Sequence, residues 1–163
     1  MRNPCIINGT SHGNELYTLE DYMFNNREII LDETVSTESV TGLIHQLRYL
    51  DNIQPGKEIT LYISSPGGEV ISGLALYDAL RMLKSPIKTV VYGRAASMGA
   101  ILFLAGDKRL MTRHSQIMIH DPSINMGNAP SKALEVQETL EGLMKMREEL
   151  ARIIADRTGK KLR

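Results

Sequence analysis

Ser97 stands where a sheet could place a reactive hydroxyl. It lies in the segment GRAASMGAI (93–101), directly after the strand-like run PIKTVVY (86–92). Small residues two positions before and after it, Ala95 and Gly99, allow a strand to turn sharply into a helix. Since serine is also a favoured helix cap, this segment alone leaves two interpretations open, a nucleophile or an N-cap.

A second glycine-rich turn favours the nucleophile. In SSPGGEV (64–70), Pro66 and Gly67 fit the central positions of a type II turn, and Gly68 is expected to open the next helix. Consecutive strand-to-helix turns of a parallel sheet lie at the same edge, where ligands usually bind. The main-chain N–H groups of Gly68 and Met98 can therefore converge on one oxyanion, and each such donor is typically worth about 10²–10³ in rate.

A nucleophilic serine needs a base, and the sequence contains four histidines, His12, His45, His114 and His120. His12 lies in a polar segment, His45 lies off the apolar stripe of its helix, and His114 lies in the turn RHS. These three are expected at the surface. His120 ends the apolar run QIMIH, so it is either a general base at a strand end or a histidine satisfied within the core or at the surface.

The elements that must position these residues alternate along the chain. Strand-like runs occupy 28–31, 58–64 and 87–92, with further runs at LMT and QIMIH, and helical patterns follow 36–37, 68 and 97. The longest helical pattern begins at Ser131 and ends at Thr158-Gly159, as a glycine C′ residue would end it. Residues 1–15 are polar and glycine-containing, which predicts a mobile arm or loop. This alternation predicts one α/β domain, residues 1–163, with parallel strands.

Composition excludes several classes of protein. Lys and Arg together number 19, as do Asp and Glu, so no charge bias indicates nucleic acid or an anionic membrane. No apolar run approaches about 18 residues, and the first twenty residues lack the apolar core of a signal peptide. A single cysteine, Cys5, is compatible with a reducing compartment. These features predict a soluble cytoplasmic protein.

Three motifs in order resemble the proteolytic subunit of the ATP-dependent Clp protease (ClpP): LYISSPGGEVISGLALYDAL, GRAASMGAILFLAG and IMIHDPS. The start, TSHGNELYTLEDYMFNNREIIL, is also similar. The resemblance implies a ClpP/crotonase-like spiral of ββα units with a protruding handle helix at 131–158. It implies a serine endopeptidase with Ser97 as nucleophile, His120 as general base, and an oxyanion hole made by Gly68 and Met98.

The same resemblance implies the surroundings of the site. Residues Ile124, Asn125, Met126 and Gly127 would pair with the substrate backbone. The positions matching the docking pocket for an AAA+ unfoldase are Tyr62, Val90, Tyr92 and Leu110. The handle would interleave two heptameric rings into a homo-oligomeric barrel, with the N-terminal arm around the axial pore. Substrates would be unfolded polypeptides cut into short peptides. No metal or cofactor is implied, because the partner unfoldase uses the ATP.

The resemblance ends before the acidic third member of the triad, which the family carries beyond its handle helix. No residue here matches that aspartate. Asp121 follows His120 but would point away from it in an extended chain, and Asp107 lies in a loop. Three interpretations stay open: part of a longer ClpP, a naturally short subunit of a mixed ring, or an inactive subunit. The rival functions are a non-catalytic ring subunit and a crotonase-type acyl-CoA enzyme.

Overall fold

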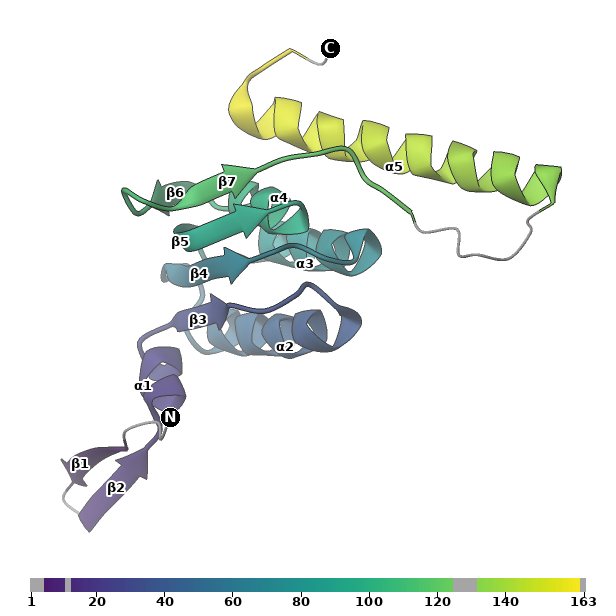
Figure 1. Ribbon diagram of the computed structural model, residues 1–163. Coiled ribbons are helices and arrows are strands. Elements are labelled where there is room, and N and C mark those ends of the chain that lie inside the picture. The colour runs from purple at the N-terminus through teal and green to yellow at the C-terminus, as the bar shows by residue number, and fades with distance from the viewer. Residues whose placement is uncertain (1–4, 11–12, 125–131, 162–163) are drawn as a thin grey trace.

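The computed structural model describes residues 5–10, 13–124 and 132–161. Over these described residues, seven strands and five helices alternate along most of the chain (Figure 1). In chain order they are β1 (Ile6–Thr10), β2 (Gly13–Tyr17), α1 (Leu19–Asn25), β3 (Glu28–Leu31), α2 (Thr37–Ile53), β4 (Ile59–Ser65), α3 (Val70–Met82), β5 (Ile87–Ala96), α4 (Met98–Leu104), β6 (Lys108–Met111), β7 (Gln116–Met118) and α5 (Ala133–Thr158). Within the described residues, none of the helices has the length and apolarity needed to span a bilayer.

The main sheet is parallel, as the alternation predicts. Its order is β3-β4-β5-β6, and β7 also pairs with β5. The ten-residue strand β5 accommodates both neighbours, because β6 pairs with its first part, at 88–91, and β7 pairs with its last part, at 94–96. The α/β class with parallel strands is therefore confirmed. The length of β5 was not predicted, since the expected strand ended at Tyr92.

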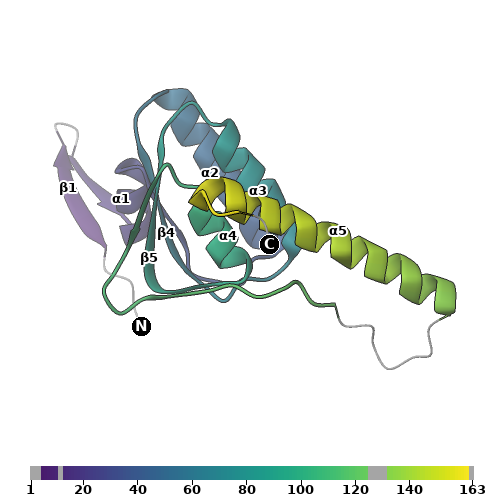
Figure 2. The same cartoon turned by 90° about the horizontal axis from the view of Figure 1, so that it is seen from above.

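Helices α2, α3 and α4 cover one face of this sheet (Figures 1 and 2). Alternate strand residues point into that layer and are buried, for example Leu61 and Ile63 of β4 and Val91 of β5. The apolar stripe of α2 belongs to the same core, with Val40, Leu43, Leu47 and Leu50 all buried. Ser36 caps α2 through a reciprocal hydrogen-bonded pair with Ser39, which confirms the expected helix start.

Helix α5 docks on the body through its C-terminal part only. Leu150 and Ile153 are buried, and Arg157 donates to the carbonyl oxygens of Leu104 and Gly106, each at 2.8 Å. The N-terminal part projects beyond the sheet, as Figures 1 and 2 show. Gly159 ends the helix in the left-handed conformation (φ 70°), so the predicted glycine stop is confirmed.

The N-terminal segment differs from the expected arm or loop. Strands β1 and β2 form an antiparallel hairpin that pairs Ile6 with Tyr17 and Thr10 with Gly13. The hairpin lies apart from the main sheet in Figure 1, beyond α1. The sequence did not predict this pairing, because the described side chains of the hairpin are not buried and so show no alternation of apolar and polar residues.

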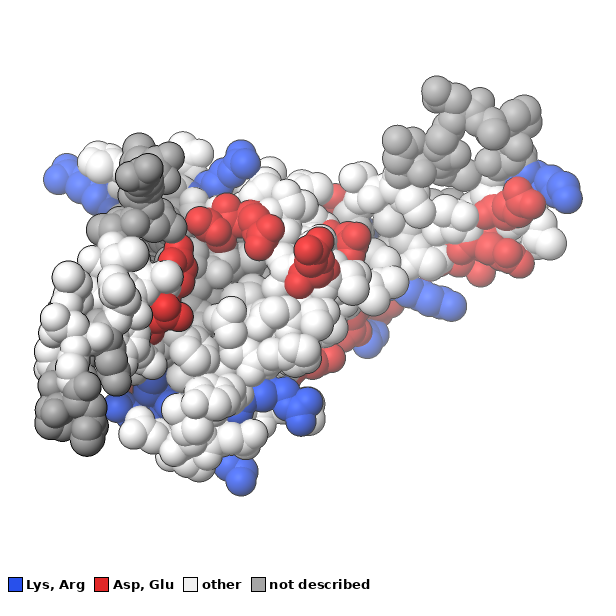
Figure 3. All heavy atoms as spheres, turned by 90° about the horizontal axis from the view of Figure 1, so that it is seen from below, with Lys and Arg blue, Asp and Glu red and all other residues white. Residues whose placement is uncertain are grey.

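Charged side chains are divided into groups on the surface that Figure 3 shows. Acidic and basic groups both appear on that face, with uncharged surface between them. This arrangement agrees with equal totals of acidic and basic residues.

Candidate active site

Strands β5 and β7 end side by side and bring Ser97 and His120 to the same edge of the sheet. Ala96 and Met118, the last residues of the two strands, are partners in the register. The main-chain N–H of Ser97 donates to the carbonyl oxygen of Met118 at 2.8 Å. Ser97 therefore follows one strand by one residue, and His120 follows its neighbour by two.

Ser97 has a backbone conformation that L-residues rarely adopt. Its φ is 53° and its ψ is −121°, although it directly precedes α4. Its side chain makes no capping hydrogen bond. Ser97 therefore occupies the N-cap position of α4, where its carbonyl oxygen accepts from Ala100 N–H and Ile101 N–H, but its hydroxyl does not cap the helix. A serine held in a strained turn between a strand and a helix has the geometry of a nucleophile elbow.

The turn after β4 packs directly against this elbow. A Cβ on Gly67 would lie 2.6 Å from the Ala96 carbonyl oxygen and 2.6 Å from the Ser97 Cβ. On the other side, a Cβ on Gly99 would lie 3.2 Å from the Ser65 carbonyl oxygen. Small residues are therefore needed around Ser97 to let two chain segments approach. The φ of 91° at Gly67 also suits the type II turn expected there.

Two main-chain N–H groups lie in the turns that form the elbow and its neighbour. Within the described residues, neither the N–H of Gly68 nor that of Met98 donates a hydrogen bond. Gly68 has φ 154°, and a Cβ there would lie 2.1 Å from the Val35 carbonyl oxygen. Bonds from Val35 N–H to the Gly67 oxygen and from Glu69 N–H to the Val35 oxygen fix this turn. Gly68 does not open α3 as expected, because the helix begins at Val70.

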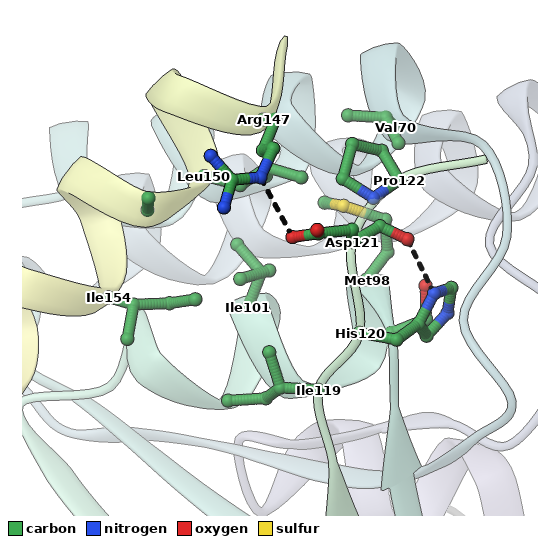
Figure 4. A pocket seen from close by; sticks show the side chains of 12 residues that line it. Val70, Met98, Ile101, Ile119, His120, Asp121, Pro122, Arg147, Leu150 and Ile154 are labelled. Atoms are coloured by element: carbon green, nitrogen blue, oxygen red, sulfur yellow. Dashed lines mark hydrogen bonds and ion pairs between the residues drawn. The ribbon is translucent and has the colours of Figure 1, made fainter. Parts of the chain in front are cut away.

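Ser97 and His120 line one pocket of about 60 Å³. Its other walls are mostly apolar and come from α4, α5 and the segment after β7 (Figure 4). Within the described residues, the Ser97 hydroxyl forms no hydrogen bond, so Ser97 and His120 share the pocket without being hydrogen-bonded to each other. The wall residues are Val70, Met98, Ile101, Ile119, Asp121, Pro122, Arg147, Leu150, Ala151 and Ile154.

The ring of His120 is held by main chain. Its Nδ1 lies 2.6 Å from the carbonyl oxygen of Asp121, whereas the Asp121 carboxylate bonds Arg147 of α5. Figure 4 shows both contacts, with the carboxylate directed away from the ring. The expectation that Asp121 points away from His120 is confirmed. Among the described residues, no carboxylate forms a hydrogen bond with this imidazole.

A second, larger groove of about 350 Å³ adjoins the pocket and shares Val70 with it. Gly68, Glu69, Ile124 and residues of α5 line it. Hydrogen bonds from Ser72, and then from Thr37, lower the pKa of the Glu69 carboxyl. Because Ile124 and Gly68 line the same groove, this predicted substrate-binding residue lies beside the candidate oxyanion hole. Asn125, Met126 and Gly127 lie outside the described residues.

The four predicted docking residues share the face of the sheet opposite α2–α4. Tyr62 is the register partner of Val90, and Val90 is the register partner of Leu110, so these three form a row across β4, β5 and β6. Tyr92 meets Tyr62 edge to face, with ring centroids 6.2 Å apart. Burial raises the pKa of the Tyr92 phenol. Leu110 is 54% exposed.

The remaining candidates lie away from the pocket. His45 and His114 are exposed, as expected, and His12 lies outside the described residues. Asp107 accepts a hydrogen bond from Ile87 N–H and pairs with Arg81, so its role is structural. In the part of the chain that the structure describes, no three His, Cys, Asp or Glu side chains are grouped to hold a metal ion.

Sequence reasoning missed Ser65 and Arg147. Ser65 Oγ donates to the Glu33 carbonyl and accepts from Gly67 N–H, which orders the turn beside Ser97. A serine two residues before a turn glycine is a recognisable signal for such a bond. Arg147 carried no such signal, because its partner Asp121 lies 26 residues away and on no common element.

Comparison with known families supports the resemblance in the sequence. The model of one family, described as Clp protease, matches residues 11–163. The match covers all three motifs, the elbow at Ser97, the strand end at His120 and the whole of α5. The chain therefore belongs to the Clp protease family, whose members are ClpP-type peptidases.

Proposed function

We propose that this chain is a serine endopeptidase subunit that cleaves unfolded polypeptides. The strained conformation of Ser97 carries the proposal, because a hydroxyl that neither caps its helix nor bonds a neighbour has no evident structural reason to be held at φ 53°. The shared pocket with His120 and the two unpaired N–H groups add to it. The family match favours this activity over acyl-CoA chemistry.

The proposed reaction uses these groups in order. The Ser97 Oγ attacks the scissile carbonyl carbon, while His120 Nε2 accepts the hydroxyl proton. The main-chain N–H groups of Gly68 and Met98 stabilise the oxyanion of the tetrahedral intermediate. The intermediate then breaks its C–N bond, and the proton on His120 passes to the leaving amine. Water, activated by the same imidazole, hydrolyses the resulting acyl-enzyme ester and restores Ser97.

The pocket and groove indicate how a peptide would bind. Apolar walls made by Ile101, Ile119 and Leu150 suit an apolar side chain next to the scissile bond. The adjoining groove past Gly68 and Ile124 would hold the extended backbone. Neither the formation of the acyl-enzyme nor its hydrolysis requires a metal or a cofactor in this proposal.

Assembly and delivery complete the proposal. Heptameric rings would stack in pairs through α5, whose N-terminal part exposes Leu134, Val136, Leu140 and Met144. An AAA+ unfoldase, the component that uses ATP, would dock on the face formed by Tyr62, Val90, Tyr92 and Leu110. The hairpin β1–β2 would surround the axial entrance, in a cytoplasmic particle.

Active-site labelling tests the proposal. A fluorophosphonate is expected to label the wild-type protein on Ser97, and Ser97→Ala should lose both labelling and about 10⁴-fold or more of peptide cleavage. Thr41→Ala is the matched control, because Thr41 is an exposed hydroxyl of α2 bonded only within its own helix. Cleavage by Ser97→Ala at the wild-type rate would disprove the proposal. An assembled, unlabelled wild-type ring would instead identify the non-catalytic subunit.

A further inference from the structure

The groove beside the candidate active site has a single ionisable side chain in its wall. Glu69 is the only ionisable residue among the described residues that line it, and it is exposed. Most of the other lining is apolar, including Ile71, Ile124, Leu143 and Met146. Glu69 directly follows Gly68, one of the two proposed oxyanion donors. Because the groove shares Val70 with the pocket of Ser97, a peptide bound at Ser97 can extend past Glu69.

The Glu69 carboxylate is held in one orientation through one of its two oxygens. Oε2 accepts from Ser72 Oγ at 2.7 Å, from Thr37 N–H at 3.1 Å and from Thr37 Oγ1 at 3.2 Å. These donors belong to the first turns of α2 and α3, whose positive dipole ends favour the charged carboxylate. A side chain that is already fixed in this way loses little freedom when it binds a ligand.

The second carboxylate oxygen, Oε1, is not used by this network. In the part of the chain that the structure describes, no group donates to Oε1, and no lysine, arginine or histidine forms an ion pair with Glu69. The contact between α2 and α3 needs Oε2 alone, so Oε1 keeps its capacity to accept a hydrogen bond. An unpaired carboxylate in an otherwise apolar groove is complementary to a cation at the end of an apolar stem, which is the chemistry of lysine and arginine side chains.

We propose that Glu69 selects peptides with a lysine or arginine side chain in this groove, within a few residues of the scissile bond; this inference rests on the proposed peptidase function. The stem of the basic side chain packs on Ile71 and Ile124, and its charged end donates to Oε1 of Glu69. Glu69 takes no part in the chemistry at Ser97. Its role is to determine which polypeptide segments are cleaved fastest.

The exposure of Glu69 limits the size of the expected preference. Exposed ion pairs contribute modestly, because water and salt screen them and long side chains lose freedom. Norleucine has the stem of lysine without the ammonium group, so a lysine peptide and its norleucine counterpart isolate the charge. We expect kcat/KM to favour the lysine peptide about two- to fivefold in low salt. The preference should disappear near 1 M NaCl, where the Debye length is roughly 3 Å.

Three variants separate the charge of Glu69 from its structural contact. Glu69→Gln keeps an acceptor for Ser72 and Thr37 but loses the charge, so its lysine-to-norleucine ratio should fall to about one. Glu38→Gln is the matched control, because Glu38 is an exposed carboxylate in the first turn of α2 that lines neither pocket nor groove. It should keep the wild-type ratio. Ser72→Ala removes the 2.7 Å bond but keeps the charge, so its ratio should stay above one.

Peptide binding to an inactive protein gives a readout that does not require cleavage. Dye-labelled lysine and norleucine peptides are titrated against Ser97→Ala, and fluorescence anisotropy measures the Kd of each. The lysine peptide should bind about two- to fivefold more tightly. The double variant Ser97→Ala, Glu69→Gln should bind both peptides equally.

The outcomes distinguish this inference from the proposed function. If Ser97→Ala loses cleavage but the two peptides are cleaved and bound alike by proteins that retain Glu69, the selection is overturned and the peptidase stands. A ratio that Ser72→Ala abolishes as fully as Glu69→Gln does would also overturn it, because the contact rather than the charge then matters. If Ser97→Ala cleaves as fast as the wild type, the peptidase proposal fails. The Kd values with and without Glu69→Gln then decide alone whether Glu69 selects basic side chains.

Discussion

The residues that matter most here were easier to identify by type than by conformation. The sequence indicated Ser97 and His120, because each follows a strand-like run and belongs to a residue type that catalyses acyl transfer. It left the capping and nucleophile interpretations of Ser97 open. The backbone angle that bears on this choice could not be predicted, because the elbow packs against Gly67, thirty residues earlier in the chain. The contact between the Asp121 carbonyl oxygen and the His120 ring could not be predicted either, because every residue has a main-chain carbonyl.

Strain at Ser97 predicts a conflict between stability and activity. Glycine adopts positive φ without penalty, so Ser97→Gly should unfold at higher urea, with about 1 kcal/mol of added stability, while losing all peptidase activity. Ser97→Ala is the control, because it removes the same hydroxyl but keeps a Cβ in the strained conformation. Equal stability of the two variants would show that this turn is not strained.

At the scale of elements, periodicity predicted most of the fold. The apolar stripe and Ser36 cap located α2, and Gly159 located the end of α5. The sequence did not predict that β5 continues through Gly93 and Arg94, two residues that interrupt its apolar alternation. This extension pairs with β7 and brings His120 beside Ser97. The pairing is a property of three strands together, which no single segment encodes.

At the opposite ends of the same strands, ion pairs between Glu58 and two lysines are expected to make the stability of the fold depend on pH. Glu58, which precedes β4, binds Lys108 at 2.8 Å and Lys88 at 3.3 Å. The hydrogen bond from Lys108 is the largest cause that lowers the pKa of Glu58 below 4.5, and the bond from Lys88 adds to it. A lowered pKa in the folded state means stabilisation that is complete above about pH 4.5 and lost as the pH falls through the folded pKa.

We therefore expect Glu58→Gln to be less stable than the wild type at pH 7 by at most about 1 kcal/mol, since the lysines are partly exposed. The difference should shrink below about pH 4.5, where the wild-type carboxyl becomes protonated. Urea unfolding of both proteins between pH 7 and 3.5 measures it. A gap that stays constant over this range would show that the ion pairs do not stabilise the strands.

At the scale of the whole molecule, α5 has an apolar surface that no other described residue covers. Val136, Leu140 and Met144 recur every four residues and are 39%, 55% and 52% exposed. Such spacing places them on one face of the helix. In the sequence, Leu140, Leu143, Leu150 and Ile154 lie at helical spacing on one apolar stripe. The structure divides it, because only the part from Leu150 onward reaches the core.

A charge on the uncovered part tests the proposed stacking of rings. Leu140→Glu should raise the concentration for half-assembly at least about tenfold, because burying a leucine contributes roughly 1.5–3 kcal/mol. Light scattering with size-exclusion chromatography measures the assembly, and circular dichroism should be unchanged. Glu138→Gln, a change of charge of the same size and opposite sign at a neighbouring exposed position, is the control. Wild-type assembly by Leu140→Glu would rule out this face as the contact.

Because only the C-terminal part of α5 packs on the core, the two parts of the helix are expected to differ in their rates of amide hydrogen exchange. In the unassembled Leu140→Glu form, main-chain amides near residues 134–146 are expected to exchange with deuterium at rates close to those of an isolated helix. Amides near 150–158 should exchange far more slowly, because opening them breaks the packing of Leu150 and Ile153 and both bonds of Arg157. Arg147 lies between the part of α5 that should exchange fast and the part that should exchange slowly. The slowly exchanging part of α5 is then also the part that lines the candidate pocket, through Leu150, Ala151 and Ile154.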